Sequence, residues 1–439
     1  MKFLRAKTNF IFKNEFYRHV VTLVGGAGGA QAITLVFFPI LSRLFGPKDF
    51  GLLASYTAIV GICSSILCGR YEYAIVLPKK DSEAVNITCL SFCFAFIISL
   101  FTIPVFCFWA KGSTEHSNYL FASNWIYLIP FNLMLVGGSQ ALSYWNLREK
   151  NFQIMSLSRL ASSIFNIVVS IFIALLIDIE GGLLFAYFFS GAVSFLVLLG
   201  GMRSVVHHLF TGVNFYKIQN VAKRYRKFPI YGLLPSFFDS FTLSMPVLFL
   251  NSFFGTIVSG HYAICMKALQ FPMNLIGNAV SQVFHQRVAK LHAAHVDISE
   301  FVTETFKKLF FISVPIFFIM ICAPLWFGLV FGSQWEEAGW YAVILAPAIT
   351  LRFIVSPLSV VFGVVNRQEI AAIWKGGAFA STGVCLGGSL VFLNPKMSLV
   401  CLMLNDLFIY SIYLYFIFKV TNVGGSGFLL RKTSFLFRK

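Results

Sequence analysis

The stretch LSFCFAFIISLFTIPVFCFW, residues 90–109, runs for twenty residues without a charged side chain. An α-helix needs about 20 such residues to cross the hydrocarbon core of a bilayer. A transmembrane β-strand needs only about 10 residues and alternates apolar with polar side chains. This stretch shows no such alternation, and it therefore predicts a membrane-spanning helix.

The same composition extends over the whole chain. Of its 439 residues, 58% are hydrophobic and only 12% are charged, whereas a soluble domain carries about 25% charged residues. We therefore predict an all-α integral membrane protein with about twelve transmembrane helices. Their apolar stretches are 19–42, 50–69, 85–109, 120–145, 158–177, 182–202, 229–253, 257–284, 309–331, 338–365, 370–393 and 397–419.

The cations predict the orientation. With twelve spans and an inside N-terminus, 28 of the 34 Lys and Arg residues fall on the cytoplasmic side and four on the opposite side. This bias follows the positive-inside rule, which predicts that both termini are cytoplasmic. The net charge of +17 is then a topological signal that anionic lipid strengthens, and it does not indicate nucleic-acid binding.

The longest connection is RSVVHHLFTGVNFYKIQNVAKRYRKF, residues 203–228, which separates six spans from six. We expect it to hold a helix lying on the membrane surface with its basic side toward the lipid headgroups. The predicted segments are a basic N-terminus 1–18, a first bundle 19–202, the linker 203–228, a second bundle 229–419 and a basic tail 420–439.

The two halves resemble each other weakly. FFPILSRLFGPKDFGLLASY (37–56) and SMPVLFLNSFFGTIVSGHYAI (244–264) each hold a Pro, then two Gly, then a Tyr. The matched residues are Pro39 and Pro246, Gly46 and Gly255, Gly51 and Gly260, and Tyr56 and Tyr262. Internal duplication is typical of secondary transporters, whose substrate path lies between the repeats. Chance similarity between two apolar stretches is the alternative.

Three stretches carry a family resemblance: PILSRLFGPKDFGLLASY (39–56), GRYEYAIVLPKKDSEA (69–84) and SGHYAICMKALQFPMNLIGNAVSQVFHQRVAKL (259–291). The chain resembles the polysaccharide transporters, the Wzx-like O-antigen and capsule flippases of the multidrug/oligosaccharidyl-lipid/polysaccharide exporter superfamily. The resemblance implies two six-helix bundles around a central cavity. It further implies a flippase, not an enzyme, that moves undecaprenyl-diphosphate-linked oligosaccharide to the outer leaflet of the bacterial inner membrane. Membrane lipids and other polysaccharide-assembly proteins are the further partners expected, without a cofactor.

Four charged residues fall near the middle of predicted spans: Asp239, Lys267, Arg352 and Asp406. Each costs about 2.5–3.5 kcal/mol at a helix centre, so a partner or water must offset the cost. Lys267 and Arg352 are candidates to line a cavity and bind a diphosphate, which Arg contacts as a fork and Lys as a point charge. Asp239 and Asp406 are candidates for H⁺ or Na⁺ coupling. Two structural ion pairs are the alternative for all four.

Arg70 and Glu72 lie where the second predicted span meets the cytoplasm. Arg70 is a candidate to bind the diphosphate as it arrives. The alternative is an Arg that reaches toward the interface and anchors the end of the span.

Two rival functions remain open. A polysaccharide polymerase or membrane glycosyltransferase also handles such lipids, but it needs a sizeable extramembrane region, and the predicted outer loops are short. A multidrug or cation antiporter of the same superfamily would share the architecture. The nine Cys lie in apolar stretches without metal-ligand spacing, so packing is the favoured interpretation for them and no metal site is predicted.

Overall fold

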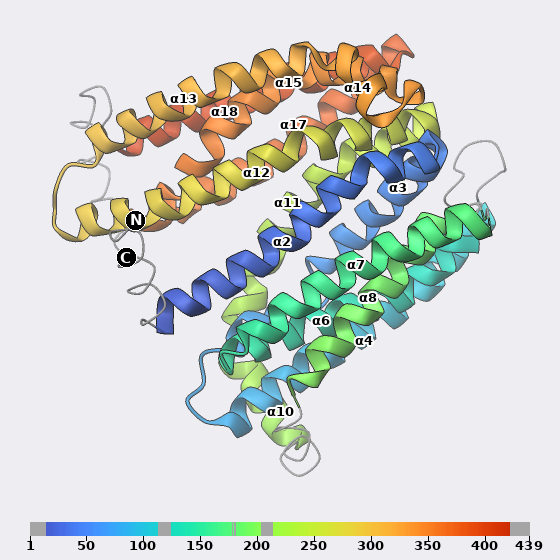
Figure 1. The fold of residues 1–439 in the computed structure, drawn as a ribbon. Coiled ribbons are helices and arrows are strands. Elements are labelled where there is room, and N and C mark those ends of the chain that lie inside the picture. Colours follow the sequence, from blue (N-terminus) through green and yellow to red (C-terminus); the bar gives the residue numbers. More distant parts are fainter. Residues whose placement is uncertain (1–14, 113–123, 178, 180, 203–213, 422–439) are drawn as a thin grey trace, which may run out of the picture. The chain divides into compact units, whose positions relative to one another are not determined.

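The computed structural model describes residues 15–112, 124–177, 179, 181–202 and 214–421, and these residues form helices joined by turns (Figure 1). No strand occurs within these ranges. The prediction of an all-α protein is therefore confirmed. The predicted basic N-terminus and basic tail lie almost entirely outside the described residues.

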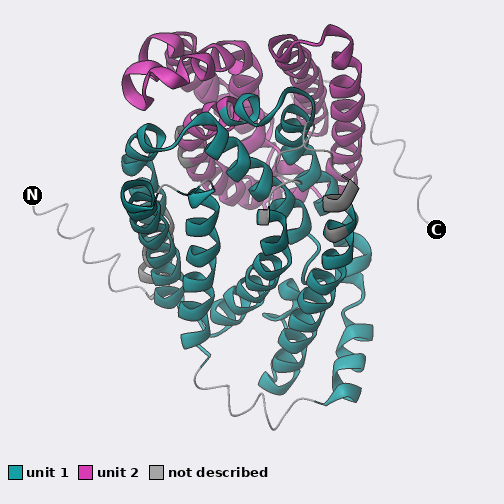
Figure 2. Ribbon diagram, turned by 90° about the vertical axis from the view of Figure 1, so that its right-hand side faces the viewer, with its two compact units in different colours: residues 1–260 teal, residues 261–439 magenta. Residues whose placement is uncertain are grey.

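The chain divides into two compact units, Met1–Gly260 and His261–Lys439 (Figure 2). Unit 1 contains α2 (Glu15–Leu44), α3 (Pro47–Ser64), η1 (Tyr71–Ala74), α4 (Asp81–Gly112), η2 (Asn124–Leu128), α6 (Ile129–Arg148), α7 (Phe152–Leu176), α8 (Gly182–Gly200), α10 (Phe215–Arg224) and α11 (Lys227–Phe254). Nearly all of α12 (Thr256–Ala293) belongs to unit 2, followed by α13 (Ser299–Ile321), α14 (Ala323–Phe331), η3 (Ser333–Trp335), α15 (Glu336–Leu358), α16 (Val361–Val364), α17 (Gln368–Ser389), η4 (Leu390–Phe392) and α18 (Pro395–Val420).

Within the described residues, each of the twelve predicted spans is covered by one helix or by two consecutive helical segments. Among the described residues, eight helices are long and apolar enough to cross a membrane, or nine if α13 and α14 count as one bent span. The long helix α12 does not meet that test. The predicted span 309–331 is covered by α13 and α14, which are bent by 68° at the break between them. Pro324 lies in the first turn of α14, where its ring blocks continuation of the preceding helix.

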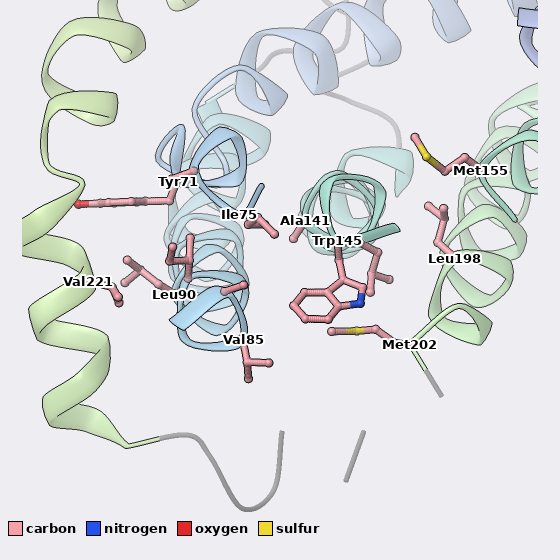
Figure 3. Packing of buried hydrophobic residues seen from close by; sticks show 14 residues of the cluster. Tyr71, Ile75, Val85, Leu90, Ala141, Trp145, Met155, Leu198, Met202 and Val221 are labelled. Atoms are coloured by element: carbon pink, nitrogen blue, oxygen red, sulfur yellow. The ribbon is translucent and has the colours of Figure 1, made fainter. Parts of the chain in front are cut away.

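The cytoplasmic end of unit 1, as the cations predict it, is held by an apolar cluster. Trp145 of α6 is fully buried there, between Val85 of α4 and Met202 at the end of α8 (Figure 3). Val221 of α10 and Tyr71 of η1 join the same cluster. The predicted helix in the linker is therefore present, and it is packed onto α4 through its apolar side.

Polar contacts fix this short helix at both ends. The Asn214 side chain accepts a hydrogen bond from the Tyr216 amide at 2.9 Å, which caps the start of α10. Near its end, Arg224 forms an ion pair of 2.9 Å with Glu83 of α4. In this position of α10, the Phe215 and Tyr216 rings are exposed. The contact of α10 with lipid headgroups stays a prediction.

Helix α11 packs against α3 and η1 within unit 1. The start of α12 approaches the start of α3 as well, and the contact is reciprocal. A Cβ added to Gly51 would overlap the Thr256 carbonyl oxygen, and one added to Gly260 would overlap the Pro47 carbonyl oxygen. Gly51 and Gly260 are the second glycines of the two similar stretches. The division into two six-helix bundles, 19–202 and 229–419, stays a prediction.

Candidate functional site

Lys267 lies on α12, eleven residues after its start, within the third family-like stretch. Its neighbours Cys265 and Leu269 are buried in unit 2. The Lys267 side chain itself is exposed. A helix places residues two positions apart on different sides, so Lys267 lies on another side of α12 than Cys265 and Leu269.

Arg352 of α15 and Asp406 of α18 lie within electrostatic range of each other, and both act on the Tyr262 hydroxyl of α12. Both charged side chains are half-buried. Within the described part of the chain, no direct salt bridge joins them. The structure thus brings three helices of unit 2 together at one cation, one carboxylate and one phenol. Among the described residues, no carboxylate contacts the guanidinium donors of Arg352 directly.

An aromatic group lies beside Arg352. The Arg352 guanidinium carbon is 6.0 Å from the centre of the Tyr410 ring, within reach of a weak cation–π contact. Tyr410 meets Trp374 of α17 edge to face at 5.3 Å, and Trp374 stacks on Tyr413 at 4.0 Å. The Trp374 indole N–H donates to the Ile409 carbonyl at 3.1 Å. These contacts fix the position of Tyr410, the ring over which Arg352 lies.

Asp239 lies on α11 in unit 1 and is half-buried. The structure therefore brings Arg352 and Asp406 together in unit 2 and places Asp239 in the other unit. Pairing of Asp239 with Lys267 or Arg352 stays a prediction.

Arg70 follows directly on a turn at the end of α3. Gly69 and Arg70 both have left-handed backbone angles, with φ of +60° and +63°. Such a conformation is strained for a residue with a Cβ, and it persists only where the surroundings impose it. The constraint here comes from the guanidinium, whose Nη1 donates to the Tyr73 hydroxyl at 2.7 Å and whose Nη2 donates to the Ser236 hydroxyl on α11. Arg70 thus joins α11 to η1.

Glu72 is the acidic neighbour of this arginine. One of its oxygens lies 3.8 Å from Arg70 Nη1, while the other is buried and makes no hydrogen bond within the described residues. The residue is 5% exposed. Burial raises the pKa of the Glu72 carboxyl, and the positive charge of Arg70 opposes that shift. The Arg70 side chain is only 18% exposed, so a phosphate could reach its guanidinium only at that uncovered part.

Several residues of these sites were not singled out in the sequence. Tyr410 and Ser236 reach Arg352 and Arg70 only through tertiary packing, and apolar spans give no signal for them. The polar residues that follow Lys267 along α12 do have a signal, their spacing of three and four. No group of three or more potential metal ligands occurs among the described residues.

Comparison with known proteins gives a family. Residues 40–339, more than half of the chain, match the family described as polysaccharide biosynthesis protein. A search of curated proteins finds no match.

Solved structures give the fold. A multidrug resistance MATE family transporter of the MOP superfamily, in an inward-facing conformation, is similar over 90% of this chain and 96% of its own, with a TM-score of 0.70 and 15% identity. The lipid II flippase MurJ, in an inward closed conformation, is similar over 98% and 93%, with a TM-score of 0.61 and 12% identity. A mutant of the Vibrio cholerae MATE transporter VcmN matches over 96% and 100%, with a TM-score of 0.55 and 12% identity. The chain is thus a multi-pass membrane protein that belongs to the polysaccharide biosynthesis protein family and has the MOP-superfamily fold.

Proposed function

We propose that this protein is a flippase that moves undecaprenyl-diphosphate-linked oligosaccharide, an O-antigen or capsule repeat unit, from the cytoplasmic to the periplasmic leaflet of the bacterial inner membrane by alternating access. The family match assigns the chain to polysaccharide biosynthesis. One solved structure that shares its fold is the lipid II flippase MurJ. Together they support a lipid-linked sugar as the substrate class.

The observation that carries the proposal is the exposed position of Lys267 near the middle of the predicted span 257–284. An ammonium group that faces hydrocarbon is costly, so its persistence requires water or an anion beside it. A diphosphate carries its negative charge in a compact group that a point charge can bind. Arg352 is half-buried, and no carboxylate of the residues that the structure describes contacts it directly. It would supply the bidentate contact to the same ligand.

Arg70 would act earlier, on the substrate arriving from the cytoplasm. Its guanidinium already donates hydrogen bonds to the Tyr73 and Ser236 hydroxyl groups. A phosphate competing for those donors would loosen the contact between η1 and α11. Binding at this position and movement of α11 would then be linked, because a ligand shifts a conformational equilibrium by its differential affinity for the two states.

Asp406 is the candidate for ion coupling in unit 2. It lies within electrostatic range of Arg352 without a salt bridge in the described part of the chain. A carboxylate in this position can accept a proton or Na⁺ in one conformation and release it when Arg352 comes closer. Asp239 is the corresponding candidate in unit 1.

The test uses a strain that lacks its own flippase and scores surface polysaccharide together with the amount of this protein in the membrane. Lys267→Ala and Arg352→Ala should abolish surface polysaccharide at normal protein levels, while Lys267→Arg should keep much of the activity. Lys308→Ala is the matched control, because Lys308 is an exposed cation that forms a surface pair with Glu304. Normal polysaccharide in both alanine variants would contradict the proposal.

A second arm separates phosphate binding from a structural ion pair. If Lys267 only neutralised Asp239 or Asp406, Lys267→Ala would leave an unpaired carboxylate, and replacing the matching Asp as well would restore both abundance and activity. We expect no such rescue. A cation antiporter would instead export cationic dyes and would leave surface polysaccharide unchanged when deleted.

A further inference from the structure

Helix α12 carries a row of polar side chains on the cytoplasmic side of Lys267. Successive members are three or four residues apart, which places them on one side of the helix. The row, which we call the polar stripe, consists of Lys267, Gln270, Asn274, Asn278, Gln282 and His285. It extends from Lys267 to His285 in one uninterrupted helix, a length of about 27 Å.

The other sides of α12 differ from the stripe. Leu269, Met273 and Phe284 are buried in unit 2. Val283, which is 66% exposed, and its neighbour Ala279 form an apolar exposed flank. The helix therefore has a packed side, a flank suited to lipid and a third side suited to water or to a polar ligand.

The stripe residues are accessible. Five of the six are exposed and Gln270 is half-buried. In the described part of the chain, Asn274, Asn278 and Gln282 make no side-chain hydrogen bond. Amide groups without partners are strongly disfavoured in hydrocarbon, so this side of α12 cannot face lipid tails. The same residues explain why α12, although long, is not apolar enough to count as a candidate span.

We infer that the polar stripe is the track along which the oligosaccharide of the substrate lies while its diphosphate is at Lys267. This inference rests on the proposed function. Each amide offers both donors and an acceptor, which suits the hydroxyl groups of sugars. One amide per helical turn, roughly every 5.4 Å, provides repeated contacts toward the cytoplasmic end, from which the sugar would enter. The stripe makes transport depend on the length of the sugar chain.

The test compares two substrates on the purified full chain in proteoliposomes. One is undecaprenyl diphosphate carrying a labelled tetrasaccharide, and the other is the same lipid carrying a single labelled sugar. The variant Asn274→Leu/Asn278→Leu/Gln282→Leu removes the three amides while keeping side chains of similar size. The matched control is Ala279→Leu on the apolar flank of the same helix.

We expect the triple variant to slow transport of the tetrasaccharide lipid by about tenfold or more, which corresponds to the loss of one or more hydrogen bonds. Transport of the single-sugar lipid should change by less than about twofold, because the Lys267 contact is intact. Ala279→Leu should leave both rates unchanged. Equal loss for both substrates, or no loss for either, would overturn the inference.

Two further results bear on it. A wild-type protein that moves neither lipid would refute the proposed function itself, and the inference would fall with it. If the wild-type protein moves both lipids and the triple variant moves both equally well, the oligosaccharide track is refuted and the proposed function is not.

Cysteine labelling gives a readout that does not depend on transport. In a background without native cysteines, a charged thiol reagent should modify Asn274→Cys, Asn278→Cys and Gln282→Cys but not Val283→Cys. The tetrasaccharide lipid should slow labelling at Asn278, and the single-sugar lipid should not. Equal protection by both lipids, or labelling of Val283→Cys at the same rate, would contradict the assigned track.

Discussion

The reciprocal contact between the starts of α3 and α12 predicts a large effect from a single methyl group. Gly51 lies in the second turn of α3. A Cβ placed there would overlap the Thr256 carbonyl oxygen and would stand 2.8 Å from the Ser259 hydroxyl. In the reverse direction, a Cβ on Gly260 would overlap the Pro47 carbonyl oxygen and stand 3.1 Å from the Gly51 nitrogen.

The magnitude follows from the atoms involved. Because carbonyl oxygens cannot rotate away as a side chain can, the two helix starts must separate by roughly 1 Å, and overpacking of this kind costs about 1–3 kcal/mol. Alanine gains at most about 1 kcal/mol over glycine inside a helix. We therefore expect Gly51→Ala to destabilise the protein by about 1–2 kcal/mol net and to lower the Tm by a few degrees. Both methyl groups force apart the same pair of helices, so the double variant should lose less than the sum of the single variants.

The assay is thermal unfolding of the full chain in detergent. Gly376→Ala is the control, since a Cβ at Gly376 in the middle of α17 meets nothing within 4 Å. That variant should melt at the wild-type temperature or slightly above it. The reasoning would be refuted if Gly51→Ala melted like Gly376→Ala, or if the losses of Gly51→Ala and Gly260→Ala added in full.

Three further predictions follow from particular residues. Arg70→Lys keeps the charge but loses the forked guanidinium that reaches both Tyr73 and Ser236. It should lower the stability by about 1–2 kcal/mol, measured as a lower Tm, and Ser236→Ala should lower it less. A Tm equal to that of the wild type would show that the Arg70 contacts with Tyr73 and Ser236 do not stabilise the fold. Because burial raises the pKa of Glu72, the folded state binds its proton more tightly than the unfolded state. The Tm should therefore rise as the pH falls from above the Glu72 pKa of the folded state toward the ordinary glutamate pKa. Glu72→Gln should remove that rise. If the Tm of Glu72→Gln depended on pH as the Tm of the wild type does, the interpretation of Glu72 as a buried carboxyl group would be wrong. Reporter fusions after Lys111, Gly181 and Lys396 should give a periplasmic signal, and a fusion near Lys223 should give a cytoplasmic signal, as the cation bias predicts. A periplasmic signal at Lys223 would refute the topology.

The sequence determined the class of the protein with little ambiguity. A bilayer imposes a length of about 20 apolar residues on every spanning helix, so stretches such as 90–109 predict their own secondary structure without reference to the rest of the chain. The orientation prediction rests on an equally local property, the positions of Lys and Arg beside the spans. The cost of a charge in hydrocarbon also singled out Lys267, Arg352, Asp239 and Asp406, because the cost exists wherever the helix lies.

Tertiary structure decided which side of each helix is packed. The hydrophobic periodicity that reveals a packed face in a soluble helix is weak here, since lipid and protein core are both apolar. The partners of Arg70 and the meeting of Arg352, Asp406 and Tyr262 arise from helices far apart in the chain, and no local pattern encodes them. The bend between α13 and α14 has a local cause in Pro324, yet proline within a membrane helix is often tolerated. The polar stripe on α12 was visible in the sequence as a spacing, but only the packing of Leu269, Met273 and Phe284 on the remaining sides shows that the stripe is left exposed.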